Sequence, residues 1–258
     1  MLGEFIQDRW IVDVLREIAD EKDISFHVWS DDWIMQLGDG RNSCRVFGYR
    51  FELNNSVAAS IAQDKVATYT ILNQQGISAV PHELVRTKVS QINRDVMEKW
   101  AKTVTKPLTG TSGHGIRLHD TAVSAIEFIE QSSIQAWAIS PYIDILVETR
   151  LILLDGNVLC AYEKEPVVIN GLKMSNLGLG AKAVNVGPSS RLVDIAKSAQ
   201  SAIGLRFCSV DVVTLMDGEV AVLEVNDAVM MEHYSRQSEQ NRAKTKDVYE
   251  AAVDAVIS

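Results

Sequence analysis

The sequence predicts an α+β fold built from helices and antiparallel ribbons. Three Asp-Gly pairs, beginning at Asp39, Asp155 and Asp217, are each flanked by apolar runs, and this arrangement favours a tight hairpin turn. Apolar residues at helical spacing lie between the ribbons, most clearly from Leu192 to Ile203, before Gly204. Helices therefore alternate with antiparallel strand pairs.

The first 55 residues form a small unit of their own. A helix is predicted from Glu4 to Glu21, followed by a strand in ISFHVW and by the hairpin about Asp39. From Ser56 a helical pattern runs to Gly76, a typical C-cap residue. Further helices are expected near 89–100 and 122–131, and strands in TVTKP, GIRLH and AWAISPYI.

Composition excludes several classes of protein. The chain has 258 residues, of which 25 are Lys or Arg and 34 are Asp or Glu, and its net charge of −9 argues against nonspecific binding to nucleic acid or anionic membranes. The three cysteines are widely spaced and form no zinc pattern. No apolar run approaches the ~20 residues of a membrane helix, and the first residues lack a signal-peptide pattern. We expect a cytoplasmic protein.

The last ribbon, VVTLMDGEVAVLEVN, carries two acids in an otherwise apolar pattern. If Asp217 and Gly218 are the centre of a two-residue turn, Asp211 faces Glu224, Val213 faces Val222, and Asn226 lies on the side of Glu224. Opposed carboxylates repel unless a cation lies between them, and three such oxygen donors suit Mg²⁺. The alternative is one solvated acid and one salt-bridged acid.

The ribbon about Asp155 and Gly156 carries a second charged group. With a two-residue turn, Glu148 faces Glu163, and Arg150 lies on their face. Arg150 is a candidate for binding an acyl substrate. Pairing with Glu148 or Glu163 is the structural alternative.

The stretch TVTKPLTGTSGHGIRL combines a strand lysine with a glycine-rich loop. Lys106 precedes Gly110, Gly113 and Gly115, whose backbone can approach an anion closely, and Thr111 and Ser112 add hydroxyl donors. Because a strand follows the loop, the pattern is neither a P-loop nor a dinucleotide fingerprint. The alternatives are a phosphate-binding loop and a flexible connector.

The order of these parts resembles the ATP-grasp superfamily from about Asn54 to Met231. QDKVATYTILNQQGISAVP, VTKPLTGTSGHGI, NLGLGA, SVDVV and VLEVN are most similar to the carboxylate-amine ligases that add glutamate to ribosomal protein S6, with kinship to glutathione and cyanophycin synthetases. The resemblance implies a short N-terminal subdomain (1–55), a small lid subdomain (56–143) and a C-terminal subdomain with the metal site (144–258).

The resemblance also implies roles for individual residues. Nucleotide phosphates would be contacted by Lys65, Lys106 and the loop Gly110, Thr111, Ser112, Gly113, His114 and Gly115. The adenine would be lined by Ser140, Pro141, Tyr142 and Ile143, and the ribose held by Glu148. Magnesium ions, with Mn²⁺ as the alternative, would be bound by Asp211, Glu224 and Asn226.

The activity implied is ATP-dependent amide formation from a small-molecule or peptide carboxylate and an amine, through an acylphosphate. Phosphoryl transfer depends chiefly on alignment and charge neutralisation, so no protein nucleophile is required. The alternatives are an ATP-grasp phosphotransferase or carboxylase-like enzyme, and a nucleotide-binding protein without turnover. Membrane and nucleic-acid partners are not expected, and homo-oligomerisation stays open.

The chain departs from its relatives in two places. NDAVMMEHY stands where relatives often have a small residue, proline and glycine after the last metal ligand. Leu179 stands where relatives have an arginine, so Lys173 or Lys182 would supply the charge there, with Lys164 competing for the phosphates. Asn176 matches the pattern and, with Arg150 and Lys173, is a catalytic candidate. Glu232 and His233 either receive the amine or begin a helix.

Overall fold

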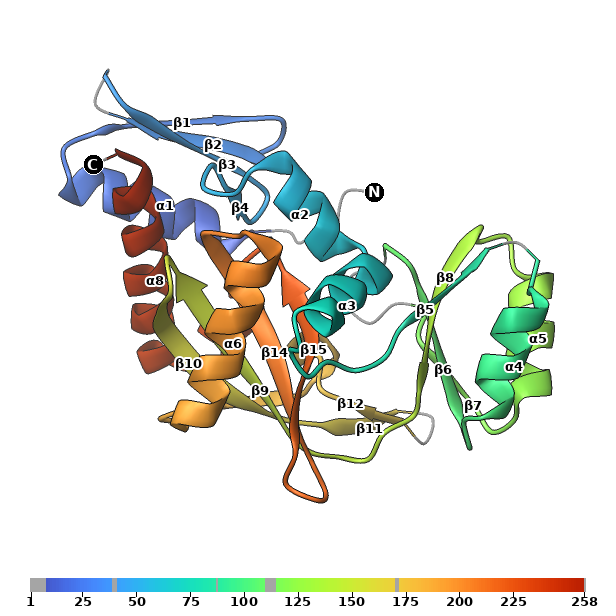
Figure 1. Cartoon of the computed structure of the whole chain (residues 1–258). Helices are drawn as coiled ribbons and strands as arrows, with labels where there is room; N and C mark the ends of the chain where they lie inside the picture. Colours follow the sequence, from blue (N-terminus) through green and yellow to red (C-terminus); the bar gives the residue numbers. More distant parts are fainter. Residues whose placement is uncertain (1–7, 39–40, 87, 110–114, 170–171, 258) are drawn as a thin grey trace.

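The computed structural model describes residues 8–38, 41–86, 88–109, 115–169 and 172–257. It confirms the α+β class, because the described strands form antiparallel sheets covered by helices (Figure 1). The described residues form two four-stranded sheets, one five-stranded sheet and a two-stranded ribbon. In this part of the chain no helix has the length and apolar character needed to cross a membrane.

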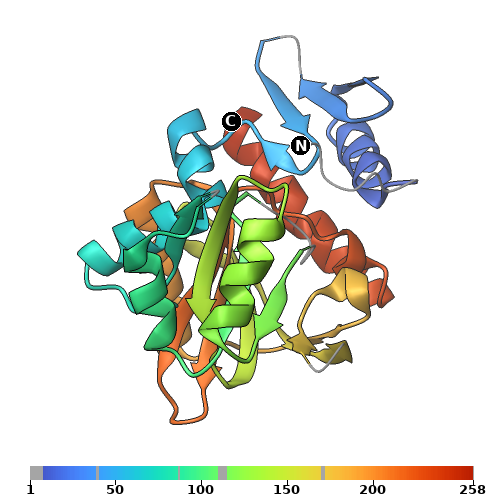
Figure 2. The same cartoon turned by 90° about the vertical axis from the view of Figure 1, so that its right-hand side faces the viewer.

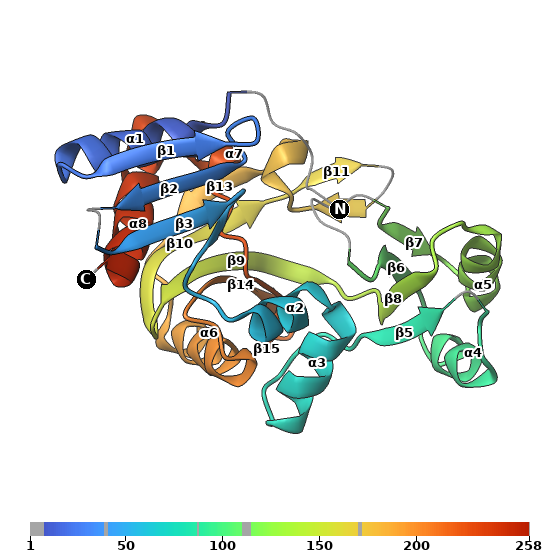
Figure 3. The same ribbon diagram turned by 90° about the horizontal axis from the view of Figure 1, so that it is seen from above.

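The N-terminal part is a four-stranded sheet packed against two helices from opposite ends of the chain (Figure 3). Helix α1 (Trp10–Glu21) begins later than predicted, because Asp8 has a positive φ of 54° and Arg9 is extended. The predicted pairing of the strands on either side of Asp39 is confirmed, because β2 pairs with β3, whereas Asp39 and Gly40 lie outside the described residues. The remaining elements are β1 (Ser25–Trp29), β2 (Ile34–Gly38), β3 (Ser43–Phe47), β4 (Arg50–Phe51) and α8 (Glu239–Ile257).

The five-stranded sheet is the centre of the molecule and has the order β13-β10-β9-β14-β15. Helices α2, α3 and α6 cover one face and α8 lies against the other (Figure 3). Leu151 and Leu153 pack with the first group, whereas Ile152 and Leu154 pack with the second, as alternation along a strand requires. The bounds are β9 (Ile145–Leu154), β10 (Asn157–Glu165), β13 (Lys182–Asn185), β14 (Phe207–Leu215), β15 (Val220–Asn226) and α6 (Ser190–Ile203).

The helix predicted from Ser56 to Gly76 is in fact two helices, α2 (Ser56–Gln63) and α3 (Lys65–Gln74). The break is at Asp64, which is extended and accepts hydrogen bonds from the backbone N–H groups of Val66 and Ala67. Asp64 is thus the N-cap of α3. This cap places Lys65 at the first position of the second helix.

The small sheet lies to one side of the large one in Figure 1 and faces the viewer in Figure 2, and it has the order β5-β8-β6-β7. Its elements are β5 (Glu83–Arg86), α4 (Gln91–Glu98), β6 (Thr103–Pro107), β7 (Arg117–His119), α5 (Ala122–Gln131) and β8 (Ala136–Pro141). Helices α2 and α3, which precede this sheet in the chain, pack on the large sheet. The small sheet with its two helices therefore spans 83–141.

The last ribbon brings Asp211 opposite Glu224 as predicted, but not through the predicted turn. Leu215 N–H donates to Glu219 O and Gly218 N–H donates to Leu215 O, so three residues form the turn. Val213 consequently faces Ala221, not Val222. A bulge between Asp211 and Val212 in the pairing restores the predicted register at the acids.

The ribbon β9–β10 corrects another prediction. It starts with the expected register, Leu154 opposite Asn157, but the register shifts by one residue between Val158 and Cys160. Glu148 therefore faces Lys164, and Glu163 faces Thr149. The bulge replaces a pair of like charges by a pair of opposite charges.

Candidate active site

A buried charge network lies on the large sheet where β9, β10 and β14 meet. Arg150 donates two hydrogen bonds to Asp211, of 2.7 Å from Nε and 2.6 Å from Nη2. Lys164 Nζ lies 2.6 Å from Glu148 Oε1 and 3.0 Å from Asp211 Oδ2. The structural alternative, in which Arg150 pairs with Glu148 or Glu163, is wrong. Its partner is Asp211.

The network keeps Asp211 ionised. Burial opposes the charge, but Arg150 and Lys164 outweigh it and hold the pKa of Asp211 well below its usual range. Burial and Arg150 lower the pKa of Lys164, yet Asp211 and Glu148 raise it above its ordinary value. Two anions and two cations therefore compensate one another.

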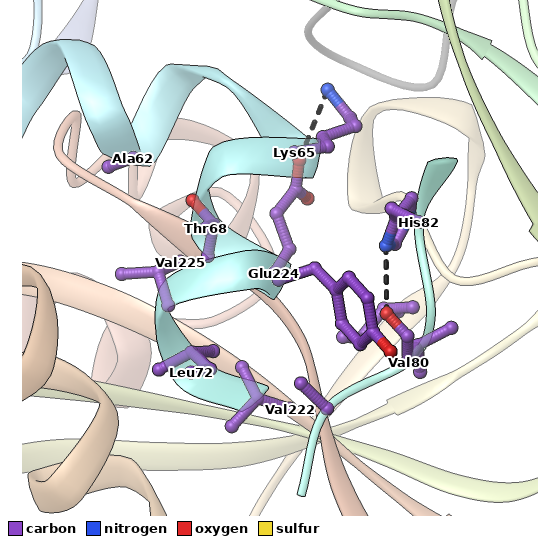
Figure 4. Close-up of a pocket in the computed structure, with 12 residues that line it drawn as sticks. Ala62, Lys65, Thr68, Leu72, Val80, His82, Val222, Glu224 and Val225 are labelled. Carbon is purple, nitrogen blue, oxygen red and sulfur yellow. Dashed lines mark hydrogen bonds and ion pairs between the residues drawn. The ribbon is translucent and has the colours of Figure 1, made fainter. Parts of the chain in front are cut away.

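Glu224 extends this acidic region toward α3 (Figure 4). Lys65 Nζ lies 3.6 Å from Glu224 Oε1, and both side chains line a small pocket between α3, β15 and the 79–82 segment. His82 lines the same pocket, and its Nδ1 lies 2.9 Å from Val80 O. Burial, followed by the charge of Lys106, lowers the pKa of His82 to about 3. This residue gave no signal in the sequence.

Lys106 approaches the same region from the small sheet. Burial lowers its pKa, the charge of Lys65 lowers it further, and Glu224 raises it. Its ammonium has no hydrogen bond or ion pair within the described part of the chain. A cation in that position suits an anionic ligand.

Asn226 ends β15 beside the acids, and its Nδ2 is buried without a partner among the described residues. Within these residues, no three His, Cys, Asp or Glu side chains form a group that could hold a metal ion alone. Asp211, Glu224 and Asn226 together offer carboxylate and amide oxygens, which are the donors that Mg²⁺ takes alongside phosphate and water. The donor chemistry therefore fits a magnesium–nucleotide complex.

The residues expected around the adenine form the connection between the two sheets. Ser140 and Pro141 end β8, Tyr142 N–H donates to Lys102 O at 2.9 Å, and Ile143 packs beside Val80. Gly110, Thr111, Ser112, Gly113 and His114 lie outside the described residues. Gly115 has a φ of +75°, and a Cβ there would lie 2.9 Å from Pro107 Cγ.

Two catalytic candidates, Lys173 and Asn176, lie outside the charge network. Lys173 is exposed on the ribbon β11–β12 (Val167–Ile169 and Leu172–Met174), opposite Val168. Asn176 accepts a hydrogen bond of 2.7 Å from Gly178 N–H and so begins the short helix η1 (Leu177–Leu179). Their proposed roles stay predictions.

The contacts of Glu232 are those of a buried residue at the start of a helix. It begins α7 (Glu232–Ser235), is 1 % exposed, and accepts hydrogen bonds from Trp10 N–H and Arg236. Of the two interpretations, the start of a helix fits these contacts.

A sequence model of one family, described as "RimK-like ATP-grasp domain", matches residues 62–246. The chain belongs to this RimK-like ATP-grasp family. All the described candidate residues of the charge network and of the pocket in Figure 4 lie within the matched region.

Curated relatives of the family include a "Probable alpha-L-glutamate ligase" of Psychromonas ingrahamii, 30% identical over 206 residues, which cover 75% of this chain and 64% of the relative. A protein of the same printed name from Legionella pneumophila (strain Corby) is 27% identical over 203 residues, again 75% of this chain and 64% of the relative. The chain thus spans somewhat less than two thirds of their length.

Solved structures share the ATP-grasp fold. D-alanine–D-alanine ligase from Bacillus anthracis, complexed with ATP, has a TM-score of 0.61 at 17% identity and covers 79% of this chain and 68% of its own. The ATP-grasp ligase PsnB, complexed with a minimal precursor, Mg and ADP, has a TM-score of 0.57 at 17% identity, covering 76% of this chain and 62% of its own. At 17% identity, the similarity of these two structures to the chain shows a shared fold only.

Proposed function

We propose that this chain is an ATP-dependent carboxylate-amine ligase that forms an amide through an acylphosphate. The observation that carries the proposal is Lys106 on the small sheet, an ammonium without a protein partner in the described chain, close enough to Lys65 and Glu224 for their charges to shift its pKa. One lysine on helix α3, which packs on the large sheet, and one on the small sheet suit the phosphates of a nucleotide bound between them.

The nucleotide would lie between the small and large sheets. Ser140, Pro141, Tyr142 and Ile143 would contact the adenine from the connection between β8 and β9. Glu148 would accept hydrogen bonds from the ribose, and Gly115 with the preceding loop residues would cover the phosphates. Lys65 and Lys106 would neutralise them.

Asp211, Glu224 and Asn226 would hold Mg²⁺, with Mn²⁺ as the alternative. The ion would neutralise charge on the phosphate oxygens. Arg150 and Lys164 hold Asp211 in its ionised form in this structure, so that carboxylate is ready to bind a cation without first losing a proton.

The substrates would be an amino-acid or peptide carboxylate and an amine, in keeping with relatives named alpha-L-glutamate ligase. A carboxylate oxygen attacks the γ-phosphorus, the bond to the β-phosphate oxygen breaks, and ADP leaves with the electron pair. The amine then attacks the acyl carbon, phosphate departs, and the amine loses a proton. The lysines stabilise charge in both steps.

Product analysis tests this proposal. The chain is incubated with Mg-ATP and pairs drawn from amino acids and short peptides, and ADP, phosphate and product mass are measured. We expect an amide whose mass equals both substrates less one water, with one ADP and one phosphate for each amide. A stable phosphorylated product, or nucleotide binding without ADP release in any pair, would contradict the ligase.

Substitution of Lys106 tests the nucleotide site separately. Lys106→Met should weaken binding of a nonhydrolysable ATP analogue at least tenfold, because the phosphates lose a charge-assisted contact. Lys102→Met is the matched control, since Lys102 lies on the same subdomain but pairs with Asp120 at the surface. Equal affinities of the two variants in calorimetry would count against the site.

A further inference from the structure

Three side chains on the face of the large sheet that carries Asp211 each have a buried polar atom without a hydrogen-bond partner among the described residues. The atoms are Tyr162 Oη, Ser209 Oγ and Asn226 Nδ2. Tyr162 is 0% exposed and Ser209 is 1% exposed. A buried polar group that has lost its hydration is costly unless it is paired, so such groups ordinarily bind water or a ligand.

Strand register brings these atoms together. Tyr162 lies directly opposite Arg150, which lies opposite Asp211 on the next strand. Ser209 is two residues before Asp211 and directly opposite Asn226. Opposed residues, and residues two apart, project from the same face of a sheet. The three side chains therefore lie on the same face of the sheet as the Arg150–Asp211 pair, in neighbouring positions of the strands.

The patch formed by Arg150, Tyr162, Ser209 and Asn226 has several polar groups without a partner in the described chain, and all of them can donate hydrogen bonds. Arg150 gives Nε and Nη2 to Asp211, and its Nη1 makes no hydrogen bond within the described chain. The hydroxyl groups of Tyr162 and Ser209 and the amide nitrogen of Asn226 donate as well. Both oxygens of Asp211 already accept hydrogen bonds or salt-bridge contacts. The donors that remain suit an oxyanion.

The surroundings of the patch favour an organic acid over a bare phosphate. Ile152 lies directly opposite both Ser209 and Cys160, so the row beside the hydroxyl is apolar. The ring of Tyr234 stacks on Tyr162 with centroids 4.6 Å apart. Donors next to apolar side chains can hold a carboxylate and the carbon chain attached to it.

We propose that Arg150, Tyr162, Ser209 and Asn226 form the subsite for the carboxylate of a small organic acid. This inference rests on the proposed ligase function, in which that carboxylate takes the γ-phosphoryl group. The amide of Asn226 has two ends, so its oxygen can face the cation while its nitrogen donates to the carboxylate. One carboxylate oxygen is thereby held, and the other is left to attack phosphorus.

The test removes single oxygen atoms. Ser209→Ala and Tyr162→Phe each delete one proposed donor and keep the shape of the side chain. Thr149→Val is the matched control, because Thr149 Oγ1 is also buried without a described partner but, next to Arg150 on β9, projects from the opposite face. All three variants should melt at or above the wild-type temperature, since an unpaired buried group is removed.

The probe is acetate, with acetamide as its uncharged analogue, and the signal is the side-chain amide resonance of Asn226 in the chain saturated with Mg and a nonhydrolysable ATP analogue. We expect a saturable shift with acetate and none with acetamide. The acetate dissociation constant should rise about tenfold or more in Ser209→Ala and Tyr162→Phe, and stay at the wild-type value in Thr149→Val.

Each outcome decides the proposal. No saturable shift with acetate, or wild-type affinity in both donor variants, would show that these groups hold water only. The same titration without nucleotide separates the two hypotheses. A chain that binds the nucleotide analogue but not acetate would overturn the subsite alone, and one that binds acetate but no nucleotide would overturn the ligase alone.

Discussion

Lys164→Met removes the cation that lies between Glu148 and Asp211. Both contacts are short, 2.6 Å and 3.0 Å, and the side chains of Lys164 and Glu148 are 6% and 9% exposed. Asp211 keeps both hydrogen bonds from Arg150, but Glu148 is left without a partner among the described residues. Breaking one partner of a buried pair costs about 3–5 kcal/mol, so we expect a loss near the lower value.

The double variant Glu148→Met/Lys164→Met separates the missing contact from the unpaired charge. With both groups replaced by apolar side chains, the cost should fall to within about 1 kcal/mol of wild type, because no buried charge remains uncompensated. The exposed control is Arg206→Met, which removes two hydrogen bonds to Asp155, of 2.9 and 2.7 Å. Ion pairs between exposed side chains such as these contribute about 0–1 kcal/mol to the free energy of unfolding.

Urea unfolding followed by tryptophan fluorescence measures all three variants, with a common m-value as the check on two-state behaviour. The expected order of destabilisation is Lys164→Met first, then the double variant and Arg206→Met together. The view that Lys164 compensates Glu148 would be refuted if Lys164→Met were at least as stable as Arg206→Met. It would also be refuted if the double variant were less stable than Lys164→Met.

Two further changes are predicted from the structure. His82 has a pKa of about 3 in the folded chain against an ordinary value of 6.5, so between these values only the unfolded chain binds the proton and stability falls as the pH falls. His82→Gln should therefore reduce the loss of unfolding free energy between pH 7 and pH 5 by about 2 kcal/mol in urea titrations without nucleotide; equal pH profiles would contradict this. Gly115→Ala should cost more than Gly156→Ala by about 1–2 kcal/mol. Both glycines have positive φ, but only at Gly115 would the Cβ meet another side chain, Pro107 at 2.9 Å, and thermal unfolding of the two variants gives the comparison.

The sequence predicted the elements of the fold better than their register. Strand Thr103–Pro107 and helix Ala122–Gln131 have the predicted bounds, because each is a compact pattern bounded by turn or capping residues. Asp211 and Glu224 face each other, yet this holds only because a three-residue turn and a bulge shift the register in opposite directions. The helix break at Asp64 was missed, since apolar spacing continues across it. The capping hydrogen bonds decide the break.

A rule that opposite charges should face each other across paired strands would have corrected the predicted register of β9–β10 but would have given a wrong register for β14–β15. On β9–β10 the two-residue turn alone sets Glu148 against Glu163, a repulsive pair, whereas a one-residue bulge sets Glu148 against Lys164. Requiring opposite charges across the strands would have found that bulge from the sequence.

The same rule applied to β14–β15 would have rejected the pairing of Asp211 with Glu224. That pairing persists because the compensating cations come from elsewhere, with Arg150 and Lys164 on β9 and β10 and Lys65 on α3. An inner strand has two neighbours and two covered faces, so its charges cannot be balanced within one ribbon. The acids of this site were therefore visible in a single hairpin, whereas the cations that hold them depend on how three separate segments assemble.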